Sequence, residues 1–162
     1  MTRTMKNTSK TMQKPFTNKY KNKTNKTKTK TKTIKRYTNS KIVQKFMELL
    51  TMIKLYHWKT HSYAQHKATD ELYSKLNENI DKFVEVLLGK SSHRVKMMET
   101  KMKMYDLEDK LELKEHIFEY RQFLIDMNHC FSPKKDSDLF SIRDDILGDL
   151  NQFLYLLTFD QP

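Results

Sequence analysis

The segment from residue 57 to residue 85 is dense in side chains that can bind metal ions: His57, His61, His66, Asp70, Asp81 and Glu85. His66 and Asp70 are four residues apart, and so are Asp81 and Glu85. On a helix, residues at this spacing lie one turn apart on one face, so each pair could share one metal ion. A mixed set of imidazole and carboxylate ligands suits ferrous iron, manganese or zinc.

The two pairs are too far apart to hold one ion together. Eleven residues separate Asp70 from Asp81, which places both pairs on nearly the same helix face but ~16 Å apart along the axis. Metal–ligand bonds of about 2 Å cannot bridge that gap. A second copy of the helix, packed antiparallel around a two-fold axis, would bring His66 and Asp70 of one subunit opposite Asp81 and Glu85 of the other. The spacing therefore predicts a homo-oligomer, with a two-fold dimer as its minimum.

Four segments repeat their apolar residues at helical spacing. We expect helices over about residues 41–59 and 63–88, from 106 or 107 to the Ser132-Pro133 break, and from about Asp138 onward. The expected core positions of the third helix include Leu111 and Phe118.

Helix-terminating residues agree with these ranges. Asn39 or Ser40 is placed to cap the first helix, and Ser62 with Gln65 fits a capping box at the start of the second. Gly89 is a natural C-terminal stop for the second helix.

A long polar, Lys-rich and Met-rich segment, residues 89–106, separates the second helix from the third. It is long enough to cross the length of a bundle and has room for a short helix. Alternation typical of strands occurs only in the charged N-terminal segment. Two helical hairpins joined by a long crossover are the ferritin-like variant of the four-helix bundle, so the predicted fold class is all-α.

The positive charge of the chain is confined to its N-terminal segment. Residues 1–38 hold 13 of the 31 Lys and Arg residues and no Asp or Glu, leaving 18 basic and 20 acidic side chains in residues 39–162. The segment also has too few apolar residues to offset the entropy cost of ordering. We therefore expect a disordered basic tail over 1–38 and a four-helix bundle over 39–162.

A tail of this charge is expected to bind DNA or another polyanion by displacing counterions from phosphates, with little base readout. A solubilising tail or an import signal is the alternative. The candidate nucleic-acid-binding residues are Lys19, Lys21, Lys23, Lys26, Lys28, Lys30, Lys32, Lys35 and Arg36.

The metal-binding pattern resembles that of the Dps family of mini-ferritins, DNA-binding proteins of starved cells. His57-Trp58 is similar to the His-Trp that ends the family's first helix, His66 to Asp70 matches its His-x-x-x-Asp, and Asp81 to Glu85 matches its Asp-x-x-x-Glu.

The resemblance implies that ferrous iron is oxidised at sites between two subunits, with His57 completing the ligand set. It also implies a shell of about a dozen copies and a flexible Lys-rich arm that binds DNA. His61 is expected to serve as an alternative ligand, or to lie next to the ligands and orient them without binding the metal itself. Trp58 is a candidate for the same supporting position, with packing as its alternative.

A non-enzymatic ferritin-like protein that binds or packages nucleic acid, with a degenerate metal site, remains the alternative function, followed by an adaptor bundle with an import tail. Within the chain, no Glu-x-x-His pair supports a di-iron site inside the bundle, and two glycines cannot build a phosphate-binding loop.

The sequence contains no apolar run that could span a bilayer and no secretory signal. We therefore expect no membrane partner and an intracellular protein, cytoplasmic or nucleoid-associated. A virion location follows if the amino-acid bias typical of A/T-rich genomes reflects a viral gene.

Overall fold

The computed structural model describes residues 36–91, 94 and 101–159. Within these ranges all regular structure is helical, as predicted. The helices are α1 (Asn39–Lys59), α2 (Tyr63–Ser91), α3 (Lys110–Asp126) and α4 (Ser137–Leu156), with a 3-10 turn, η1 (Met127–His129), directly after α3. The chain divides into two units, Met1–Lys32 and Thr33–Pro162. The first unit, which contains most of the predicted tail, lies outside the described residues.

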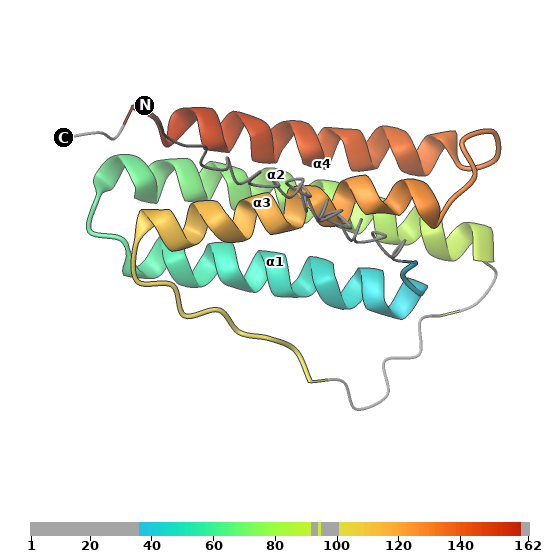
Figure 1. Ribbon diagram of the computed structural model, residues 1–162, viewed down its shortest axis with the longest axis horizontal. Helices are drawn as coiled ribbons and strands as arrows, with labels where there is room; N and C mark the ends of the chain where they lie inside the picture. The colour runs from blue at the N-terminus through green and yellow to red at the C-terminus, as the bar shows by residue number, and fades with distance from the viewer. Residues whose placement is uncertain (1–35, 92–93, 95–100, 160–162) are drawn as a thin grey trace, which may run out of the picture. The chain divides into compact units, whose positions relative to one another are not determined.

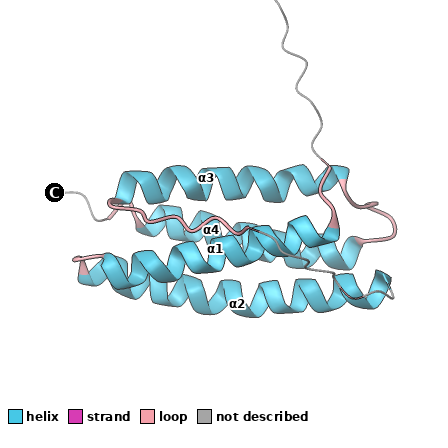
Figure 2. Cartoon of the chain, turned by 90° about the horizontal axis from the view of Figure 1, so that it is seen from below, coloured by secondary structure: helices cyan, strands magenta, loops and turns pink. Residues whose placement is uncertain are grey.

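The four helices lie side by side along one axis (Figures 1 and 2). α1 and α2 run antiparallel, and so do α3 and α4, whereas α2 and α3 run in the same direction (Figure 1). The connection from α2 to α3 must therefore return along the bundle. Its described part, residues 101–109, contains no helix and runs lengthwise beside α1 (Figures 1 and 2).

The start of α1 and the end of α2 differ from the predictions. Thr38 caps α1, because its Oγ1 accepts a hydrogen bond from the backbone N–H of Lys41 at 3.2 Å; the assignment of the cap to Asn39 or Ser40 was wrong. Gly89 does not end α2, which continues to Ser91. Glycine often ends a helix but does not always do so, and here the residues after Gly89 stay helical.

The α2 N-terminus agrees with the capping prediction in part. The backbone N–H of Gln65 donates to Ser62 Oγ at 3.3 Å, as in a capping box. In a capping box the backbone N–H of Ser62 would donate to the side chain of Gln65. Here this N–H donates to Thr60 Oγ1 at 3.2 Å.

The third helix starts later than predicted. Asp109 accepts hydrogen bonds from the backbone N–H groups of Leu111 and Glu112 at 2.8 and 2.9 Å, so α3 begins at Lys110. Residues 106–109 therefore belong to the connection.

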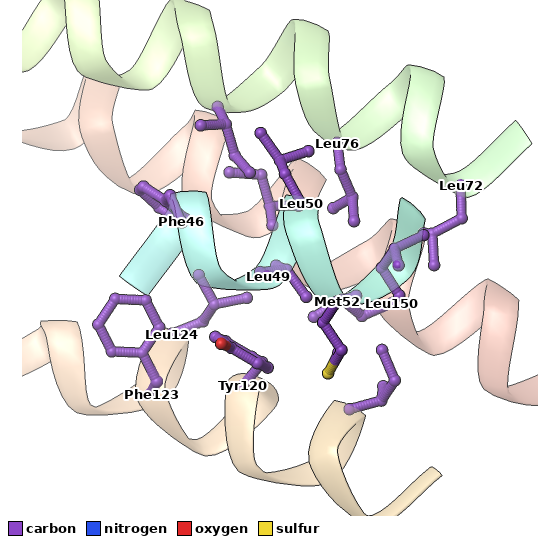
Figure 3. Packing of buried hydrophobic residues seen from close by; sticks show 14 of the residues in the cluster. Phe46, Leu49, Leu50, Met52, Leu72, Leu76, Tyr120, Phe123, Leu124 and Leu150 are labelled. Carbon is purple, nitrogen blue, oxygen red and sulfur yellow. The ribbon is translucent and has the colours of Figure 1, made fainter. Parts of the chain in front are cut away.

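The core lies between the helices and takes side chains from all four of them. Figure 3 shows side chains of α1 interleaved with those of α2 and α3. The Phe46 ring makes edge-to-face contacts with Phe83 of α2 and Phe123 of α3, at centroid distances of 5.2 and 5.8 Å. Leu111 and Phe118 do not join this core; they are 67% and 45% exposed.

Candidate metal centre

His57 lies near the end of α1 and is almost fully buried, at 7% exposure. Its Nδ1 is 3.0 Å from the carbonyl oxygen of His66 and 3.3 Å from Thr69 Oγ1. A carbonyl oxygen can only accept a hydrogen bond, so we assign the proton of the neutral ring to Nδ1. Nε2 then carries the lone pair, which is the form of histidine that binds a metal.

His66, in the first turns of α2, is held in a reciprocal way. Its Nδ1 is 3.1 Å from the carbonyl oxygen of His57, which assigns the proton to Nδ1 here as well. The two imidazole rings stack with centroids 4.0 Å apart and an angle of 22° between their planes. The three-residue turn between α1 and α2, residues 60–62, brings these two rings together.

Asp70 follows one turn further along α2. Its Oδ1 lies 3.9 Å from His57 Nε2, and its side chain is 54% exposed. The structure therefore brings together three of the five predicted ligands: His57, His66 and Asp70. The buried imidazole and the exposed carboxylate place this group at the surface of the bundle.

Asp81 and Glu85 lie on α2 and are exposed. Neither makes a hydrogen bond or an ion pair to any side chain in the part of the chain that the structure describes. Their helical separation from His66 and Asp70, ~16 Å from Asp70 to Asp81, keeps the two groups apart within one chain. Across residues 36–91, 94 and 101–159, no three His, Cys, Asp or Glu side chains are arranged to hold a metal ion.

Among the described residues, the side chains of the two supporting candidates make no hydrogen bond, ion pair or ring contact to the predicted ligands. His61 is exposed in the turn between α1 and α2. Trp58 is 68% exposed, and its ring has Lys54 Nζ at 5.8 Å from its centroid.

Thr69 is a contributor that the sequence does not reveal. It is fully buried, and its hydroxyl donates to the carbonyl oxygen of Gln65 at 2.8 Å while lying 3.3 Å from His57 Nδ1. A threonine one position before Asp70 looks like any helix residue, and only the packing of α1 on α2 shows its place beside His57.

The predicted nucleic-acid-binding residues Lys19 to Lys35 lie outside the described residues. Arg36 is described, and its Nε donates to the carbonyl oxygen of His129 at 3.1 Å. With Tyr37, whose ring contacts Phe123 at 5.1 Å, it belongs to the helical unit although we assigned it to the tail.

Residues 57–157 match a family of unknown function (DUF5856). The chain belongs to this family. Its DUF5856 region starts at His57 and includes α2, α3 and α4.

One curated protein is similar to the chain. It is the "Uncharacterized 14.6 kDa protein in mobD-ri intergenic region" of Enterobacteria phage T4, which is 30% identical over 104 residues. The aligned segment spans 64% of this chain and 75% of the phage protein. No solved structure matches the chain. Among the described helices, none combines the length and apolar character needed to cross a membrane.

Proposed function

We propose that this chain is a Dps-like mini-ferritin that binds ferrous iron between two-fold-related subunits and oxidises it. The order of the helices supports a ferritin-like bundle, because two antiparallel pairs are joined by a connection that returns along the bundle.

The pair of histidines carries the proposal. His57 and His66 each hold Nδ1 against the other's backbone carbonyl, so both rings have Nε2 left for a metal. Anchoring the far ring nitrogen in this way is the usual means of fixing a histidine ligand. Asp70 adds an exposed carboxylate beside them.

The second half of the site would come from another copy. Asp81 and Glu85 are exposed on the same helix as His66 and Asp70 and lack partners among the described residues. An antiparallel α2 from a second subunit would bring its Asp81 and Glu85 to the first subunit's histidines. Ferrous iron is the substrate, and each ion would give one electron to dissolved oxidant at an open coordination position.

The basic tail would hold the assembly on DNA. Its 13 positive charges over residues 1–38 favour binding to phosphates without regard to sequence. The similarity to a phage protein supports a viral setting for this activity.

The iron proposal is tested with purified protein. Ferrous iron is added without oxygen, air is admitted, and the ferric product is followed by near-ultraviolet absorbance. We expect the wild type to oxidise iron faster than the double variant Asp81→Ala with Glu85→Ala. The matched control, Glu115→Ala with Asp145→Ala, removes two exposed carboxylates elsewhere and should behave as the wild type. Equal rates for the wild type and the Asp81 and Glu85 variant would refute the ferroxidase.

A second candidate is a ferritin-like bundle that binds nucleic acid without oxidising iron. The stacking of the His57 and His66 rings, with centroids 4.0 Å apart, favours this candidate. Two stacked rings can pack stably without binding a metal ion. Salt-sensitive DNA binding together with iron oxidation no faster than buffer would select this candidate.

A further inference from the structure

A cavity of about 330 Å³ lies apart from the histidine group, between α3, the N-terminal part of α1 and the described part of the connection. Its volume is at the lower end of the range of about 300–1,000 Å³ typical of small-molecule sites. None of the five predicted metal ligands lines it.

Aromatic side chains form much of the cavity wall: Tyr37, Tyr105, Tyr120 and Phe123. Tyr120 is 3% exposed, and its hydroxyl has no hydrogen-bond partner among the described residues. A buried hydroxyl left without a partner costs about 1–3 kcal/mol, and a ligand that supplies the missing hydrogen bond would recover this cost. Several aromatic rings around one small space suit a flat ring as ligand.

The polar groups of the cavity include both donors and acceptors. Asp126 accepts from Gln122 Nε2 at 2.7 Å, and the Tyr37 hydroxyl is 3.5 Å from its other oxygen. Glu119 is exposed and uses Oε2 toward His116 at 3.1 Å, which leaves Oε1. Lys103 offers an ammonium group without an ion-pair partner in the described part of the chain. The carboxylates and the amide oxygen of Gln122 can accept hydrogen bonds from the exocyclic amine of a nucleic-acid base. The ammonium group of Lys103 can bind a phosphate.

The cavity lies close in sequence to the basic segment, so a nucleic-acid base is the flat ring that we expect it to bind. Tyr37 lines the cavity and lies at the C-terminal end of the basic segment, next to the exposed Arg36 in the sequence. The Arg36 guanidinium uses Nε toward the His129 carbonyl, so its Nη donors can reach a phosphate. A strand held by the tail would thus arrive at an aromatic cavity.

We propose that this cavity binds an unstacked base of single-stranded nucleic acid, with preference for bases that carry an exocyclic amine. The aromatic walls contact the face of the base, Glu119 and Asp126 accept from its amine, and Lys103 and Arg36 contact the flanking phosphates. This inference rests on the proposed binding of nucleic acid by the tail and is independent of iron oxidation.

The test measures binding of the full chain to oligo(dA), oligo(dT) and a duplex of equal length by fluorescence anisotropy at fixed salt. Tyr105→Ala removes one wall, Tyr105→Phe keeps the ring, and Tyr155→Ala is the control for loss of an exposed tyrosine elsewhere. We expect Tyr105→Ala to weaken oligo(dA) binding by at least roughly fivefold, with Tyr105→Phe, Tyr155→Ala and duplex binding unchanged. Circular dichroism confirms that each variant folds.

Ultraviolet cross-linking of the wild type to oligo(dA), followed by peptide mass spectrometry, locates the base. Cross-links at Tyr37 or Tyr105 are expected. Cross-links confined to residues 1–35, with Tyr105→Ala binding as tightly as the wild type, would overturn the cavity site and leave the tail as the nucleic-acid binder. Absence of binding to both single strands and duplex would overturn the cavity and the tail together, whereas the iron assay would still decide the metal site.

Discussion

Glu48 is a carboxylate with 1% exposure in the middle of α1, and it holds the connection between α2 and α3 in place. Its Oε1 accepts from the backbone N–H of Lys103 at 3.1 Å and from Gln44 Nε2 at 2.7 Å, and its Oε2 is 2.9 Å from Lys45 Nζ. Gln44 Nε2 also donates to the carbonyl oxygen of Lys101 at 3.0 Å. Burial raises the pKa of the Glu48 carboxyl, but these hydrogen bonds outweigh burial and keep the pKa below its ordinary value of 4.5.

Replacing this carboxylate should destabilise the fold in a pH-dependent way. We expect Glu48→Gln to lower the free energy of unfolding by about 1–3 kcal/mol at pH 7, because charged hydrogen bonds in a buried site are lost. A depressed folded-state pKa contributes stability above pH 4.5 and loses it as the pH falls through the folded value. Urea denaturation at pH 7 and at a pH below the folded-state pKa of Glu48 should therefore show the two proteins converging in acid.

The control is Glu115→Gln, which changes an exposed carboxylate on α3. It should leave the free energy of unfolding nearly unchanged at both pH values. An equal loss of stability by Glu48→Gln at both pH values would show that the charge of Glu48 does not hold the connection.

At the level of single residues, spacing alone could pair His66 with Asp70 and Asp81 with Glu85, since helical periodicity is local. It could not show that each histidine ring is anchored on the backbone carbonyl of the other. That contact depends on how the turn at residues 60–62 folds α2 back on α1.

At the level of elements, the type and order of the helices followed from apolar periodicity, but several helix ends did not. Thr38, Asp109 and Gly89 illustrate the reason. Several neighbouring residues could cap each helix, and the choice depends on small differences in local hydrogen bonding, about 1 kcal/mol per cap.

Gly89 and Gly148 lie inside α2 and α4, respectively, and a Cβ added at either position would meet no atom within 4 Å. Alanine restricts the unfolded chain more than glycine and adds no clash here. We expect Gly89→Ala and Gly148→Ala each to raise the free energy of unfolding by roughly 0.5–1 kcal/mol. Thermal unfolding followed by circular dichroism measures the effect, and a lower melting temperature for either variant would contradict the helical position of that glycine.

At the level of the whole molecule, α3 carries an exposed apolar stripe that includes Leu111 and Phe118, two residues that we expected in the core. Leu111, Phe118 and Ile125 recur every seven residues along α3 and are 67%, 45% and 42% exposed. Periodicity cannot distinguish a stripe covered by its own chain from one covered by another copy. An oligomer would cover such a stripe, so we expect light scattering to give a mass of at least two chains. A stable monomer would leave both halves of the metal site incomplete.

The tail provides a separate whole-molecule prediction. Because residues 36–38 contact or cap the helical unit, the clean deletion removes residues 1–35. We expect the full chain to bind duplex DNA with an affinity that falls steeply as salt rises, and the deletion to lose most of that affinity. Gel-shift titrations at several salt concentrations measure both. Equal binding by the two forms would remove the tail from the mechanism.

The central claim is that each iron site uses two subunits, and subunit mixing tests it most directly. One variant carries His66→Ala with Asp70→Ala, and the other carries Asp81→Ala with Glu85→Ala. Each alone should oxidise iron no faster than buffer. Because a two-fold mixed dimer unites the intact half-sites of both, random co-assembly should restore about a quarter of the wild-type sites. A mixture as inactive as its components, although mixed dimers are shown to form, would contradict a site shared between subunits.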